Sequence, residues 1–156
     1  MRTISKKTQY GLKVMLALGN RYGEGPVLIA TLSREESIPL KFLEVILLKL
    51  KGQGLLASKS GKGGGYELAK PPSAITIGTL IRMLEGPLAA LPCASETAFR
   101  ACDDCVDVES CGTRMIMRQV RDATADILDR TTLSDLVHRV KAARAEKAEE
   151  PIMYYI

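Results

Sequence analysis

The chain has 156 residues, 46% of them hydrophobic, so it can bury one compact core and still present an apolar face to a partner. No apolar run reaches membrane-spanning length and no signal peptide is recognisable, so we expect a cytoplasmic protein with no membrane partner. Residues 1–85 hold 13 Lys and Arg against 6 Asp and Glu, whereas the remainder holds 9 against 12. A basic first half suits a polyanionic partner, although solvated surface lysines would look similar. The aromatic content of 4% disfavours single-strand stacking platforms, and duplex DNA is the better expectation.

The first elements predict a helix-turn-helix. A helix over residues 6–21, with Ser5 as its N-cap, is followed by a short helix over residues 29–35. After a turn at residues 37–39, a stronger helix is expected over residues 40–51, stopped by glycines. In such motifs the second helix reads the DNA.

A basic hairpin follows this motif. Short strands are expected over residues 55–59 and 66–69, and the Ser-Gly-Lys-Gly-Gly-Gly segment between them, residues 60–65, forms the tip. A glycine turn alone carries no function, but after a helix-turn-helix it can approach a phosphate backbone or minor groove. We therefore predict a wing, and a short helix over residues 77–84, capped by Thr76, completes a DNA-binding domain over residues 1–86.

Two charged residues lie near the start of the expected reading helix, Lys41 and Glu44. A carboxylate repels phosphates, so Glu44 is either solvated or placed to accept a hydrogen bond from a cytosine amino group. The residues by themselves favour solvation. The apolar residues of this helix are expected in the core: Leu43, Ile46, Leu47 and Leu50.

All four cysteines lie in a segment without helical or strand periodicity, residues 87–111. Gaps of eight, two and five residues separate Cys93, Cys102, Cys105 and Cys111. Structural zinc usually uses two close cysteine pairs, and this spacing offers one. Nearby carboxylates oppose thiolate formation unless a cation is bound, so we predict a metal-binding sensor loop. Zinc, an iron-sulfur cluster and redox-active thiols stay open at this point.

Two late helices are expected within a dimerisation segment over residues 112–150, before an apolar tail at 151–156. The first, over residues 112–129, carries one apolar stripe, and the second, over 133–148, is amphipathic. We expect their apolar faces to be buried against a second copy, with packing on the same chain as the alternative. A dimer presents two reading helices to a palindromic operator. The stripe comprises Ile116, Val120, Ala123 and Ile127.

Residues 38–44 and 61–66, the cysteine segment and residues 132–136, taken in order, resemble the Rrf2 family of bacterial winged-helix transcription regulators. The resemblance covers nearly the whole chain, and the glycine-rich wing followed by Tyr66 is its most specific part. It implies a mainly α fold with a small β-hairpin wing and a long dimerisation helix. It further implies a homodimer that binds double-stranded operator DNA, senses iron, redox or nitric oxide status through a cysteine-ligated iron-sulfur cluster, and is not an enzyme.

In this family three cysteines hold the cluster, and they match Cys93, Cys105 and Cys111 best. Cys102 is additional, so all four cysteines are candidate ligands. Regulators of cluster assembly in the family place a histidine ligand where this chain has Arg114. The resemblance therefore implies all-cysteine coordination and favours a [4Fe-4S] cluster over a [2Fe-2S] cluster.

The resemblance also assigns DNA-contacting residues. The family's glutamate at the position of Glu44 helps to read bases, and its wing arginine matches Ser60, whose contact we expect Lys62 to take over. The expected DNA-contacting residues are Lys41, Glu44, Lys59, Ser60, Lys62, Gly63 and Gly64.

Two other functions compete with this prediction. The same DNA-binding dimer could be regulated without a cluster, by thiol oxidation, zinc or a partner protein, as in the family's cysteine-metabolism repressors. A small electron carrier or oxidoreductase is disfavoured, because the sequence has no nucleotide-binding glycine fingerprint and no catalytic constellation.

Overall fold

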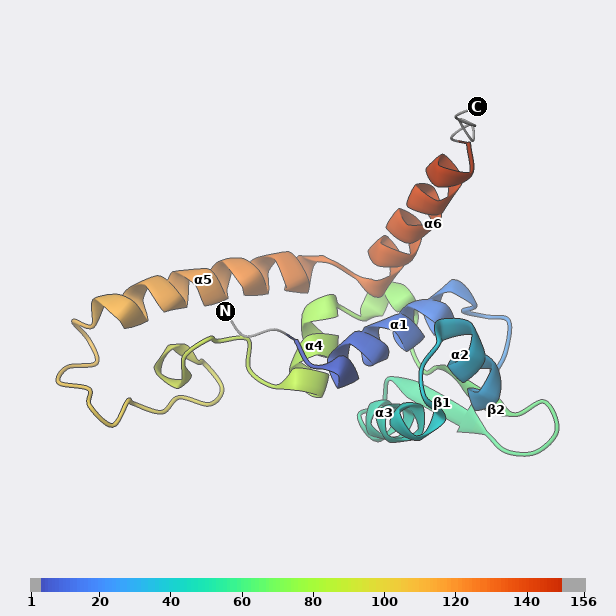
Figure 1. Ribbon diagram of the computed structural model, residues 1–156, viewed down its shortest axis with the longest axis horizontal. Helices are drawn as coiled ribbons and strands as arrows, with labels where there is room; N and C mark the ends of the chain where they lie inside the picture. Colours follow the sequence, from blue (N-terminus) through green and yellow to red (C-terminus); the bar gives the residue numbers. More distant parts are fainter. Residues whose placement is uncertain (1–3, 150–156) are drawn as a thin grey trace, which may run out of the picture.

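A computed structural model describes residues 4–149 as a mainly helical chain with one antiparallel hairpin (Figure 1). Every α-helix and strand boundary lies within one residue of the sequence prediction, whereas two short 3-10 helices, over residues 72–74 and 92–94, were not predicted. The predicted tail over residues 151–156 lies outside the described residues. None of the helices within 4–149 is both long and apolar enough to cross a membrane. In chain order the elements are α1 (Lys6–Asn20), α2 (Ile29–Glu36), α3 (Leu40–Gly52), β1 (Leu56–Lys59), β2 (Gly65–Leu68), η1 (Pro72–Ala74), α4 (Ile77–Glu85), η2 (Pro92–Ala94), α5 (Gly112–Arg130) and α6 (Leu133–Glu149).

Two helices begin at the capping residues that the sequence predicts. The Ser5 hydroxyl accepts a hydrogen bond from the Thr8 amide at 3.3 Å, at the start of α1. The Thr76 hydroxyl accepts one from the Thr79 amide at 3.1 Å, at the start of α4. Each bond satisfies an amide that has no partner within its helix, and this fixes where the helix starts.

The hydrophobic core joins α1, α3, α4 and the hairpin. The four predicted core residues of α3 are confirmed, since each is at most 1% exposed: Leu43, Ile46, Leu47 and Leu50. Met15 of α1, Leu32 of α2 and Leu80 of α4 are fully buried beside them. Leu56 and Leu68 pair across the hairpin and close the core from the side of the wing.

The start of α6 packs against α1 of the same chain. Leu133 is fully buried and Val137 is 8% exposed. Gly19 of α1 allows this contact, because a Cβ there would lie 3.2 Å from the Val137 side chain. The Leu133 amide also donates to the Ile75 carbonyl at 2.8 Å. The expectation that α6 buries its apolar face against a second copy is therefore wrong at this end of the helix, because these residues fill the chain's own core.

Helix α5 runs from the cysteine segment past α4 to α6 (Figure 1). Most of its predicted apolar stripe is exposed: Ile116 is 50% exposed, Ile127 is 65% exposed and Ala123 is exposed, whereas Val120 is half-buried. Burial of this stripe by a second copy thus stays a prediction. The C-terminal part of α5 is joined to α4 by a two-bond ion pair from Arg82 to Asp129, with N–O distances of 2.6 and 2.8 Å.

This ion pair gives a pH-dependent contribution to stability. Hydrogen bonds from Arg82, followed by its positive charge, lower the pKa of Asp129. A carboxyl whose pKa is lower in the folded chain stabilises the fold above its unfolded pKa of about 3.9, and this stability is lost as the pH falls through the folded value. We expect the free energy of unfolding of Asp129→Asn to depend less on pH below about pH 5. The difference should stay below about 1 kcal/mol, because both side chains are more than a third exposed.

Urea unfolding between neutral pH and pH 3 measures this dependence. Arg82→Met should remove the same part of it, and the double variant should remove no more than either single variant. Parallel stability curves for wild type and Asp129→Asn would contradict the assignment.

Candidate DNA interface and cysteine segment

Helix α3 turns one side to the core and leaves the other free. The outward face carries Lys41, Val45 and Leu48, with Glu44 at its edge; Val45 and Leu48 are each 61% exposed. Lys41 and Glu44 were predicted from the sequence, but the two apolar residues were not, although their helical spacing sets them opposite the buried row. A face with a cation, a carboxylate and two apolar side chains can meet phosphates, base edges and thymine methyl groups.

Two side-chain hydrogen bonds fix the orientation of α3. The Ser33 hydroxyl of α2 donates to the Ile38 carbonyl at 2.7 Å, across the turn of the helix-turn-helix. The Lys51 ammonium at the end of α3 donates to the Ser58 hydroxyl of β1 at 2.6 Å. Helix α3 and the hairpin therefore lie side by side (Figure 1), which brings the predicted reading helix and wing into one unit.

The wing contains a third strand-like segment, paired with β2, that the sequence did not reveal. The amides and carbonyls of Val27 and Tyr66 exchange two hydrogen bonds, of 2.8 and 2.9 Å. Gly65 makes this close approach possible, since a Cβ there would overlap the Val27 carbonyl. Gly64 is buried in the same way against the Lys59 carbonyl. Gly64 therefore shapes the hairpin from inside. It was expected to contact DNA, but it does not lie on the exposed surface of the wing.

The remaining predicted wing residues are exposed: Lys59, Ser60, Lys62 and Gly63. Gly61 and Gly63 have φ angles of 87° and 73°, in the left-handed region that glycine adopts without strain. These glycines turn the chain at the tip. The two lysines therefore stand on a narrow, solvent-facing loop that can follow a phosphate backbone.

Replacement of Gly65 by alanine tests the steric role of the wing glycines. Its φ is 144° and its Cβ would meet backbone atoms, so we expect a loss of about 1–3 kcal/mol in the free energy of unfolding. Gly63→Ala is the matched control, because its added Cβ meets nothing within 4 Å and costs only the left-handed backbone strain. Urea unfolding of both variants checks this order, and equal losses would contradict it.

The cysteine segment is fastened to α5 by two arginines. The Arg114 guanidinium donates through Nε to the Cys93 carbonyl at 2.9 Å and lies 5.8 Å from the centre of the Phe99 ring. The Arg121 guanidinium donates to the Ala94 carbonyl at 2.6 Å, and Arg121 is only 8% exposed. Together they hold the η2 turn against the side of α5. In the sequence Arg114 was identified only as a residue that cannot ligate a metal, and Arg121 carried no signal of its role.

The acidic end of this segment is ordered by Asp107. Its carboxylate accepts hydrogen bonds from the Glu109 and Ser110 amides at 3.0 and 3.2 Å, and from the Ser110 hydroxyl. The hydroxyl bond, followed by the Glu109 amide bond, lowers the pKa of Asp107. The turn leads directly into Cys111, the residue before the first turn of α5.

The structure brings two of the four cysteines together. The Cys102 thiol donates to the Cys93 sulfur at 4.0 Å, and this hydrogen bond is the main reason that the pKa of Cys102 is raised. Cys93 is 4% exposed and Cys102 is exposed, whereas Cys105 and Cys111 are half-buried. Within residues 4–149 no three metal-ligating side chains are gathered into one site. The donor set of four thiols suits a soft metal or cluster, but the loop must rearrange to enclose one.

The order of these elements and the glycine-rich wing agree with a known family. A family model described as "Rrf2: Iron-dependent Transcriptional regulator" matches residues 4–139. The chain belongs to the Rrf2 family. The resemblance noted in the sequence is thereby confirmed.

Relatives of this Rrf2 protein are transcription regulators. A putative HTH-type transcriptional regulator rrf2-like of Rhodobacter capsulatus is 36% identical over 137 residues, which cover 86% of this chain and 91% of the relative. CymR of Bacillus subtilis is 33% identical over 153 residues, 98% of this chain and 99% of the relative. The solved structure of CymR, the global cysteine regulator of B. subtilis, has a TM-score of 0.73 at 34% identity and covers 89% of this chain and 98% of its own. The structure of T. potens IscR has a TM-score of 0.71 at 30% identity, with 99% and 97% covered.

These comparisons confirm the winged-helix fold and show that the Rrf2 protein is a DNA-binding transcription regulator and not an enzyme. They do not agree on the signal that is sensed, since CymR is named for cysteine regulation and the family model for iron dependence.

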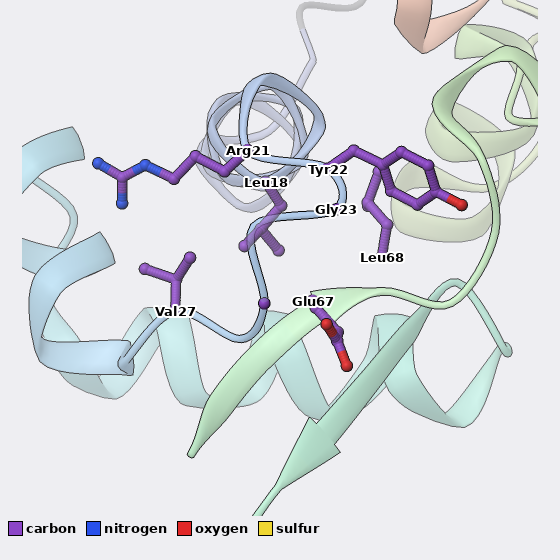
Figure 2. A pocket seen from close by; sticks show the side chains of 8 residues that line it. Leu18, Arg21, Tyr22, Gly23, Val27, Glu67 and Leu68 are labelled. Carbon is purple, nitrogen blue, oxygen red and sulfur yellow. The ribbon is translucent and has the colours of Figure 1, made fainter. Parts of the chain in front are cut away.

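A cavity beside the wing of the Rrf2 protein does not have the features of a small-molecule sensor site. It measures about 350 Å³ and is lined by residues of α1, the following loop and β2 (Figure 2). Figure 2 shows Arg21 and Tyr22 leaving the end of α1 in opposite directions. Arg21 lines the cavity, but its guanidinium pairs at 2.7 Å with Glu35, which does not line it. Ligand pockets usually combine apolar walls with a few converging polar groups, and these polar side chains diverge.

Proposed function

We propose that this Rrf2 regulator binds a palindromic operator as a homodimer. We further propose that it senses iron, redox or nitric oxide status through an iron-sulfur cluster held by its four cysteines. The observation that carries this proposal is the attachment of the cysteine segment to α5, through Arg114 and Arg121. The same helix carries the exposed apolar stripe. A change in the cysteine segment therefore acts directly on the helix that we assign to dimerisation.

The DNA-binding part of the proposal rests on charge and shape. Lys41 and Glu44 are exposed on the outward face of α3, and Lys59 and Lys62 are exposed on the wing beside it. Lysines at both places can contact phosphates on either side of one groove, while the outward face of α3 reaches base edges.

The dimer part rests on α5. Met115, Ile116 and Ile127 are each at least 50% exposed. Exposed apolar side chains repeated along one helix mark a surface that is covered by a partner. A second copy is the natural occupant, because two-fold pairing also matches the two halves of a palindromic operator.

The cluster part rests on the donor set. Cys93, Cys102, Cys105 and Cys111 would hold the cluster as thiolates, with [4Fe-4S] favoured over [2Fe-2S]. Arg114 supports all-cysteine ligation, since its guanidinium is engaged with the Cys93 carbonyl and offers no lone pair. A bound cluster would supply iron whose presence or oxidation state depends on the iron, redox or nitric oxide status of the cell. The protein residues then have to hold the loop in one arrangement with it and in another without it.

A second candidate function retains the DNA-binding dimer and omits the cluster. CymR, described as a global cysteine regulator, matches 98% of this chain. The thiols, zinc or a partner protein would then carry the signal. Metal content separates the two functions.

The test is anaerobic purification, followed by determination of iron and acid-labile sulfide per chain and by the visible absorption spectrum. We expect matching iron and sulfide with broad visible absorption in the wild type, and loss of both in Cys105→Ala. Val106→Ala is the matched control, because this neighbouring side chain is fully exposed and cannot ligate iron. A wild-type chain without iron under strict anaerobiosis would refute the cluster and favour the second candidate. Sedimentation and operator titration of the same samples test the dimer and the DNA separately.

A further inference from the structure

The sulfur atoms of Cys93 and Cys102 lie 4.0 Å apart, although the two residues are nine positions apart in the sequence. A backbone hydrogen bond of 3.3 Å from the Arg100 amide to the Pro92 carbonyl closes the loop between them. Cys105 lies beyond the next turn, where its amide donates to the Cys102 carbonyl at 3.2 Å. The loop therefore sorts the cysteines into a close pair and two others.

The two members of the pair differ in their freedom to move. Cys93 is 4% exposed, and Arg114 holds its carbonyl against α5, while Arg121 holds that of Ala94. Cys102 is exposed and belongs to an irregular stretch between η2 and α5. A disulfide requires a sulfur–sulfur distance of about 2.05 Å, so Cys102 has to approach a fixed partner by about 2 Å. A short movement of an exposed loop residue meets this requirement.

We propose that Cys93 and Cys102 form an intrachain disulfide when the cluster-free regulator meets a peroxide. The Cys102 sulfur, as the accessible one, attacks the O–O bond of hydrogen peroxide, forming a sulfenic acid and releasing water. The Cys93 sulfur then attacks the Cys102 sulfur, forming the S–S bond and expelling a second water. In total, two thiols lose two electrons and two protons, and one peroxide is reduced to two waters.

The disulfide of the cluster-free chain does not depend on the proposed cluster function, whereas its consequence for sensing rests on that function. It removes two of the four candidate thiolate ligands and joins the irregular loop that carries Cys102 to the η2 turn. The cluster-free chain thus has two forms: a reduced form that can take up a cluster, and an oxidised form that cannot.

The experiment uses the full-length protein, treated with a chelator and a reductant, desalted anaerobically and then exposed to hydrogen peroxide. Thiol titration should fall from four to about two per chain. Trypsin cuts after Arg100, and a protease that cuts before aspartate then separates the three later cysteines into different peptides. Mass spectrometry without reduction should find the peptide that contains Cys93 joined to the dipeptide Ala101-Cys102.

Two variants make the pairing specific. Cys102→Ser should lose the linked peptide, and Cys111→Ser should keep it. Linkage of Cys93 mainly to another cysteine, disulfides between chains, or retention of all four thiols would overturn the pairing.

Anaerobic incubation with ferrous iron and sulfide, before and after reduction of the disulfide, tests the consequence for sensing. Iron uptake that is blocked by oxidation and restored by the reductant supports it, and equal uptake in both states overturns it. A wild type that takes up no iron in the reduced state refutes the cluster alone, because the peptide map still decides the disulfide.

Discussion

Replacing Glu44 by alanine is expected to remove the preference for one base pair in each half of the operator. The carboxylate is exposed at the edge of the outward face of α3, where it can accept a hydrogen bond from a cytosine amino group. Loss of such a contact costs about 1–3 kcal/mol of discrimination, roughly a 5- to 150-fold change in relative affinity. Affinity for unrelated DNA should rise slightly, because a charge that repels phosphates is gone.

Selection of binding sequences from randomised duplexes, followed by titration at one fixed salt concentration, measures this preference. Val45→Ala is the matched comparison on the same face: its apolar side chain suits a thymine methyl group, so its effect should fall at a different base pair. Lys62→Ala should lower the affinity for all sequences alike and make binding less dependent on salt. An unchanged sequence preference in Glu44→Ala would show that this carboxylate is solvated and does not contact a base.

Replacing Arg121 by alanine is expected to lower the free energy of unfolding by about 2–4 kcal/mol. Its side chain is 9% exposed, and it donates to the Ala94 carbonyl and pairs with Glu96 at 3.3 Å and with Asp122. Removal leaves that carbonyl without its donor and frees the η2 turn from α5. Amide hydrogen exchange should then accelerate over residues 92–100.

Arg118→Ala is the control for the loss of positive charge, since Arg118 lies on the same helix and is exposed. Its effect should stay within about 0.5 kcal/mol. Arg121→Lys should recover only part of the stability, because an ammonium group cannot reproduce the separate contacts of the guanidinium. Equal stability of Arg121→Ala and Arg118→Ala in urea unfolding would show that the buried arginine does not hold the loop.

The helices and strands could be predicted from the sequence because their ends carry local signals. Ser5 and Thr76 cap the helices that they precede, and Gly54, with a φ of 72°, follows the C-cap of α3. The partner of each apolar face is not a local property. Periodicity gave α6 an apolar face, but only the folded chain shows that Leu133 and Val137 fill the space beside Gly19.

The candidate site could be predicted only in part for the same reason. Cysteine spacing identified the segment. The contact between Cys93 and Cys102, however, depends on the backbone hydrogen bond from Arg100 to Pro92, which cannot be predicted from residue types. Nothing in the local pattern distinguishes the buried Arg121 from the exposed Arg118. The glycine run suggested close approach to DNA, whereas Gly64 serves a contact inside the wing.

Helix α5 is fixed at one end, where Asp129 binds Arg82 and the Thr131 carbonyl accepts from the Ile77 amide at 2.9 Å. Its 19 residues span about 28 Å, so Cys111 stands at the tip of a long arm. A shift of about 5 Å at that tip corresponds to a turn of only about 10° at the fixed end. This fixed end packs against α4, and α4 packs against α1 of the winged-helix domain, so a large movement of the cysteine segment would reach that domain as a small rotation.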